Sequence, residues 1–201
     1  MAMRLDFRNI MQFFAAISPI LLIFFLVMIS IFNSDIKGLV YLGGILIASL
    51  LNLFAMYSLN IRSPTLIPAS CNLFEFPFNL NEYIAPAFNS MFISFTMAYL
   101  LGPMISVSGI NYPVLITILG LLVLDGVTKI TGGCTTFSGV ALGSLSGISL
   151  GVLYFLALWG TGNEDLLFSN AEPSNNVICS RPKKQQFKCV VYKNGEVLKT
   201  L

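Results

Sequence analysis

Few residues of this sequence could do chemistry inside a membrane, and Asp125 and Lys129 form the clearest pair. Their spacing of four places both on one face of a helix, where they can form an ion pair. An ionisable residue within an apolar segment is also a candidate for a transport or proton site. Both fall at the end of an apolar run, where the side chains can reach lipid headgroups. We therefore expect an ion pair at the membrane surface, with a transport site as the alternative.

Histidine is absent from the 201 residues, which excludes Ser–His–Asp and Cys–His nucleophilic sites and zinc sites that use histidine. The four cysteines include no C-x-x-C pair, so neither zinc nor a redox motif is indicated. Cys179 and Cys189 could form a disulfide if their compartment is oxidising. A pairing of Cys71 with Cys134 is conceivable but has no support in the sequence. We expect no catalysis, no cofactor and no metal.

The composition is that of a membrane protein. Hydrophobic residues make up 56% and charged residues 10%, with a mean hydropathy of +0.82, whereas soluble domains carry about 25% charged residues. The net charge of +2 is too small to indicate nucleic-acid binding. Uncharged runs long enough to cross a bilayer predict five spans, near residues 10–32, 38–59, 86–107, 112–130 and 136–159.

The predicted fold is an all-α transmembrane helical bundle in residues 1–159, followed by an extramembrane tail in residues 160–201. With five spans, one side carries four basic residues close to the membrane, namely Arg4, Arg8, Arg62 and Lys129. The other side carries Lys37, because the first basic residue of the tail, Arg181, lies 22 positions beyond Trp159. Basic residues near the spans are enriched on the cytosolic side of a membrane, so this excess of four over one favours a cytosolic N-terminus, with the tail on the opposite side.

Four glycines spaced by four residues follow one face of the fifth predicted span: Gly139, Gly143, Gly147 and Gly151. Such a face lets another backbone approach closely, as in small-xxx-small packing motifs. We expect it to pack against a neighbouring span of the same chain. Packing between copies of the protein and a narrow pore lined by the glycines are the alternatives.

Two segments outside the predicted spans are candidates for partner contacts. The loop at 60–85 contains three prolines and the aromatic residues Phe74, Phe76 and Phe78, so it either lies at the membrane interface or docks on a partner.

In the tail, Asn194-Gly195 between two β-rich runs predicts a hairpin. An isolated hairpin is marginally stable, which indicates a partner. The tail's contact candidates are Arg181, Lys183, Lys184, Phe187, Tyr192, Asn194 and Gly195; its short basic run could touch lipid phosphates or an acidic surface.

Several stretches together resemble multi-pass membrane proteins of large nucleocytoplasmic DNA viruses of the chlorovirus and phycodnavirus kind. They are residues 124–134 (LDGVTKITGGC), the glycine-spaced helix after them, and residues 179–182 (CSRP) and 186–195 (QFKCVVYKNG) of the tail. The resemblance implies a minor capsid protein that ties an internal virion membrane to an icosahedral shell, with the tail and the 60–85 loop contacting major and minor capsid proteins. It also implies a thiol oxidase that could oxidise Cys179 and Cys189. The alternative function is a small oligomeric channel or transporter that self-associates through the glycine face.

Overall fold

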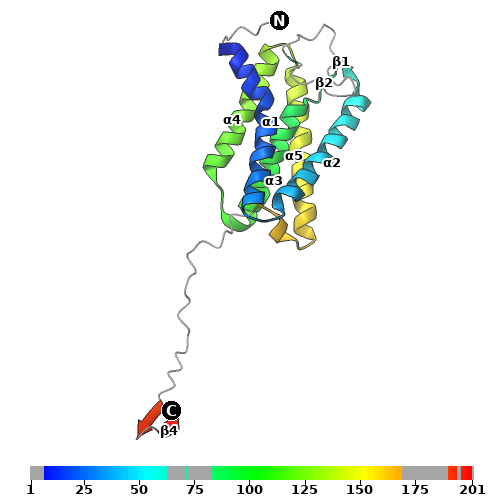
Figure 1. The fold of residues 1–201 in the computed structure, drawn as a ribbon. Helices are drawn as coiled ribbons and strands as arrows, with labels where there is room; N and C mark the ends of the chain where they lie inside the picture. The colour runs from blue at the N-terminus through cyan, green and yellow to red at the C-terminus, as the bar shows by residue number, and fades with distance from the viewer. Residues whose placement is uncertain (1–6, 63–70, 72–82, 169–189, 194–195, 201) are drawn as a thin grey trace. The chain divides into compact units, whose positions relative to one another are not determined.

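The computed structural model describes residues 7–62, 71, 83–168, 190–193 and 196–200 (Figure 1). It is mostly helical, and five helices are long and apolar enough to cross a membrane. They are α1 (Phe7–Phe32), α2 (Lys37–Leu59), α3 (Phe88–Pro103), α4 (Tyr112–Thr131) and α5 (Phe137–Gly160). The span of α3 continues through the following helical turn to Ser106. These helices lie where the uncharged runs predict spans, and the long third run divides into α3 and α4 as predicted.

Local sequence explains where the last two helices begin. The Asn111 side chain accepts a hydrogen bond from the backbone N–H of Val114 at 3.4 Å, and Pro113 occupies the first turn of α4. The Thr136 hydroxyl accepts one from the N–H of Gly139 at 3.2 Å, at the start of α5. Asn and Thr at these positions satisfy N–H groups that have no partner within the helix.

The break between α3 and α4 is a change of backbone geometry. A π-helical turn, η3 (Met104–Ser108), continues α3, and Gly109 then adopts a φ of +83°. Only glycine adopts such a conformation at little cost. The chain therefore leaves the third span here and enters α4 three residues later, at Tyr112.

Helix α3 is the central element of the bundle. It contacts each of the other four helices, and 61% of its span is buried, against 22–33% for the others. The largest fully buried side chains include Met91, Phe95 and Tyr99 of α3 and Tyr41 of α2. The outer faces of α1, α2, α4 and α5 expose large apolar side chains, as expected for helices surrounded by lipid.

The ends of the 60–85 loop pair with each other. Strand β1 (Ile61–Arg62) is antiparallel to β2 (Tyr83–Ala85), and the Arg62 guanidinium lies over the Tyr83 ring, 5.3 Å from its centroid. Phe74, Phe76 and Phe78 lie outside the described residues, so their role as partner contacts stays a prediction.

The bundle extends beyond the boundary predicted at residues 159/160. The chain divides into the compact units Met1–Asn170 and Ala171–Leu201. After α5 comes the short helix η4 (Glu164–Leu166), then Leu167, which is buried, and Phe168, whose ring makes edge contacts with Tyr41 and Tyr99. These two apolar side chains assign the first part of the polar linker to the bundle.

The second unit contains strands β3 (Val190–Lys193) and β4 (Glu196–Thr200), which are antiparallel. Tyr192 lies in β3. The predicted turn at Asn194 and Gly195 lies outside the described residues, so the hairpin as a whole stays a prediction. The same holds for the other predicted tail contacts and the Cys179–Cys189 pairing, which involve Arg181, Lys183, Lys184, Phe187, Cys179 and Cys189.

Candidate functional site

Asp125 is the centre of a polar cluster inside the bundle. Its side chain is fully buried, and each carboxylate oxygen has a partner. Oδ2 accepts a hydrogen bond from the Ser90 hydroxyl at 2.9 Å. Oδ1 lies 3.3 Å from the Lys129 ammonium and accepts a bond from the Asn89 amide at 3.4 Å. The predicted ion pair is confirmed, but the expectation that Asp125 reaches the headgroups is wrong, because α3 covers it.

The four residues lie where α3 begins and α4 ends, and the partial charges of these helix ends suit them. Asn89 and Ser90 belong to the first turn of α3, and Lys129 belongs to the last turn of α4. The amino-terminal end of a helix carries a partial positive charge and the carboxyl-terminal end a partial negative charge. The carboxylate therefore lies near the end of α3 that favours an anion, and the ammonium lies at the end of α4 that favours a cation.

The Asp125 carboxylate has partners on both oxygens, and this limits it to a structural role. A charge taken out of water is costly unless it is paired and hydrogen-bonded, and Asp125 has both kinds of partner. With three groups around it, the carboxylate is a structural acceptor between α3 and α4. Lys129 differs, because 23% of its side chain is exposed, so it connects the buried carboxylate to the end of the bundle.

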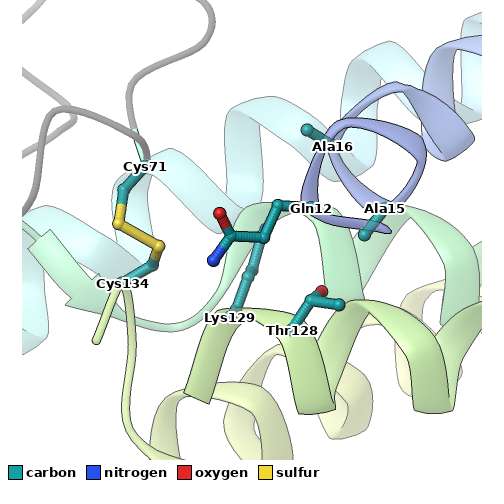
Figure 2. Close-up of a pocket in the computed structure, with 7 residues that line it drawn as sticks. All are labelled: Gln12, Ala15, Ala16, Cys71, Thr128, Lys129 and Cys134. Carbon is teal, nitrogen blue, oxygen red and sulfur yellow. A yellow bond between two sulfur atoms is a disulfide. The ribbon is translucent and has the colours of Figure 1, made fainter. Parts of the chain in front are cut away.

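A small cavity lies beside Lys129 (Figure 2). Its volume is about 30 Å³, which is enough for about one water molecule and far below the roughly 300–1,000 Å³ of typical small-molecule sites. Gln12 of α1 lines it together with Lys129, and a disulfide forms the opposite side. The other lining residues are Ala15, Ala16 and Thr128. The cavity can hydrate the ammonium but cannot hold a metabolite.

The disulfide joins Cys71 to Cys134, which are 63 positions apart in the sequence. It links the segment between α2 and α3 to the turn between α4 and α5. The same end of the bundle is held by two hydrogen bonds, from the Thr135 hydroxyl to the carbonyl of Ile84 and from the N–H of Ala87 to the carbonyl of Gly139. Sequence reasoning gave no support to this pairing because nothing in the local sequence brings the two cysteines together.

The four predicted glycines lie against α3 and the strand before it, within the same chain. All four are buried. A Cβ atom on Gly139, Gly143 or Gly147 would overlap a backbone carbonyl oxygen, and on Gly151 it would lie 2.7 Å from one. The carbonyls belong to Ile84, Ala87, Met91 and Phe95. The packing within one chain that the spacing predicts is therefore present, and this face is not free to line a pore or to join two copies.

Further buried polar groups connect α2 to the rest of the bundle. The Tyr41 hydroxyl is hydrogen-bonded to that of Thr96 in α3 at 2.6 Å. From α5, the Tyr154 hydroxyl donates to the carbonyl of Val40 at 2.7 Å, and the Ser146 hydroxyl donates to the Asn52 amide oxygen at 3.3 Å. In lipid, such bonds add to the packing of helices.

The fold and the composition define a multi-span helical membrane protein in which a few buried polar side chains join neighbouring helices. No known protein family, curated protein or solved structure matches the chain.

Proposed function

We propose that the protein is a non-catalytic membrane anchor that presents its tail to a partner. The single observation that carries the proposal is the division of the chain into a membrane bundle and a separate carboxyl-terminal unit, Ala171–Leu201. The bundle fixes the protein in lipid through the apolar outer faces of its helices.

The pairing of β3 with β4 supports this role for the tail. Within the described residues, these two strands form a sheet of their own, so each has an unpaired edge. A two-stranded ribbon alone is marginally stable in water, and an open edge can pair with a strand of another protein. The basic residues Arg181, Lys183 and Lys184 just before the ribbon favour an acidic surface on that partner.

The resemblance of residues 124–134 and of the tail to membrane proteins of large DNA viruses suggests the class of partner. The tail would bind major or minor capsid proteins, and the membrane would be the internal membrane of the virion. The 60–85 loop follows the second span and the tail follows the fifth, so the two lie on opposite sides of the membrane and the loop would not face the same shell. A shell repeats its contact sites many times, so weak tail contacts from many anchored copies add up. This multivalency lets a short tail attach a membrane to a protein lattice.

Deleting residues 179–201 tests the proposal. We expect the truncated protein to insert into membranes as before and to be lost from purified particles, measured by quantitative mass spectrometry. A matched control carries a tail of the same length and composition in scrambled order, and it should also be lost. Normal incorporation of the truncated protein would overturn the anchoring role.

A small transporter is the second candidate function, and the buried Asp125–Lys129 pair is the observation that favours it. If the protein is a transporter, the Asp125 carboxylate would exchange its present partners for a proton or an ion during transport. The isosteric variant Asp125→Asn would then abolish flux of the transported ion in reconstituted vesicles. Equal flux in the variant and the wild type, or no flux in either, would count against this candidate.

A further inference from the structure

We infer that Cys71 and Cys134 form a covalent modification site that is oxidised by a disulfide donor on the outer, oxidising side of the membrane. This assignment fixes the orientation of the chain, with its N-terminus on the oxidising side and its tail on the reducing side. It reverses the orientation favoured by the basic residues near the spans. It stands independently of the proposed function.

The number of spans places the two cysteines on one side of the membrane. Cys71 follows the second span and Cys134 follows the fourth, so both lie on the side where α1 begins. Figure 1 shows the start of α1, the β1–β2 pair and the α4–α5 turn at one end of the bundle. The fifth span then carries the chain to the opposite side, where the tail follows.

Redox chemistry determines which side this is. Structural disulfides persist in oxidising compartments and are rare where cellular thiols keep cysteines reduced. In the oxidation, one cysteine thiolate attacks the donor disulfide, forming a mixed disulfide and releasing one donor thiolate. The second cysteine thiolate then displaces the other donor sulfur. The two cysteines lose two protons and two electrons, and the donor leaves as two thiols.

The basic residues near the spans oppose this orientation less strongly than their number suggests. Of the four on the side of the disulfide, Lys129 is paired with the buried Asp125. Arg62 donates to the Asn60 side chain at 2.9 Å and lies over the Tyr83 ring. Both belong to the folded bundle and its adjoining strand pair. The six basic residues of the tail begin 22 positions beyond Trp159, too far from the last span to count for either orientation.

The inference separates the four cysteines into two classes. Cys71 and Cys134 are oxidised, while Cys179 and Cys189 follow the fifth span and remain thiols on the reducing side. The tail disulfide that the sequence left open is therefore not expected. This contrast can be read from a single protein sample.

The first experiment counts the free thiols of the protein. Fresh membranes are denatured in the presence of a polymer that carries a maleimide, which adds one polymer mass to each free thiol. We expect a gel shift of two polymer masses without reductant and of four after reduction. The variant Cys179→Ser/Cys189→Ser keeps the proposed disulfide and should show no shift until it is reduced. Four reactive cysteines without reductant would overturn the inference, as would oxidation of the tail pair alone.

The second experiment determines the side of the tail in a bacterium with an oxidising periplasm. The full chain is fused at its carboxyl terminus either to green fluorescent protein, which matures in the cytosol, or to alkaline phosphatase, which is active only after export. We expect fluorescence from the first fusion and no phosphatase activity from the second. An active phosphatase would overturn the orientation even if the disulfide is present.

Discussion

The two sides of α3 are joined to their neighbours in different ways. On the side of α5, glycines let the two backbones approach so closely that a Cβ atom has no room. On the side of α4, the contact includes a buried carboxylate bound by a hydroxyl, an amide and an ammonium. Water does not drive helices together inside lipid, so close packing and polar contacts are the two available means. The central helix uses one on each side.

The difference predicts how each interface fails. The glycine contacts extend from Gly139 to Gly151 and therefore follow α3 over several turns. The polar contacts gather around the single residue Asp125, near one end of the bundle. A defect in the glycine interface should separate two helices along their length. A defect in the polar interface should leave one charge without compensation.

The largest effect is expected from Asp125→Ala, which leaves the Lys129 ammonium without its carboxylate. Removing one partner of a fully buried pair typically costs about 3–5 kcal/mol, and the lower end of that range applies here because 23% of the Lys129 side chain is exposed. We expect a loss of this order in the free energy of unfolding, measured by denaturant titration in detergent micelles.

The double variant Asp125→Ala/Lys129→Met is the matched control for this prediction. Removing both charges leaves no buried charge without a partner, so most of the lost stability should return. If the double variant is as unstable as Asp125→Ala alone, the cost lies in the lost contacts to Asn89 and Ser90. The ion pair would then contribute little to the α3–α4 interface.

The next effect is expected from Gly147→Ala, which introduces a methyl group against the carbonyl of Met91. Overpacking typically costs about 1–3 kcal/mol, and here the obstacle is backbone that cannot rotate away. Gly120→Ala in α4 is the control, because a Cβ atom there meets nothing within 4 Å. Alanine is the better helix former by about 1 kcal/mol, so the control should be neutral or stabilising. Equal effects of the two substitutions in the same titration would show that the glycine face carries no packing role.

The sequence was sufficient to predict the spans because hydrophobicity is a local property. The uncharged runs lie within a few residues of α1 to α5, and Gly109 and Pro113 mark the break between α3 and α4. The glycine face was also visible, since a spacing of four is a property of one helix. Its partner was not, because any neighbouring helix could have supplied the backbone carbonyls.

Two features of the candidate site depend on contacts between distant segments, and local patterns do not contain them. Asp125 lies near the end of its helix, which suggested access to the headgroups, but the first turn of α3 covers it. Cys71 and Cys134 are 63 positions apart in the sequence and meet only in the folded chain. In both cases the missing information is which ends of the helices lie next to each other.

The smallest effect is expected from Tyr41→Phe at the contact between α2 and α3. Tyr41 and Thr96 share a hydrogen bond there without a charge. The Thr96 hydroxyl already donates to the carbonyl of Phe92 at 2.9 Å, so Tyr41 is the donor in the shared bond. Tyr41→Phe removes that donor and leaves Thr96 with its bond to Phe92. Interhelical hydrogen bonds in membranes contribute about 0.6 kcal/mol on average, and we expect a loss of that size.

Thr96→Val should cost more than Tyr41→Phe, because it leaves the buried Tyr41 hydroxyl without its acceptor. An unsatisfied buried hydroxyl costs about 1–3 kcal/mol. A double-mutant cycle of the two substitutions, measured in the same micelles, gives the coupling energy directly. A coupling close to zero would mean that aromatic packing around Tyr41 holds α2 against α3. The α2–α3 contact would then resemble the glycine side of the central helix and not its polar side.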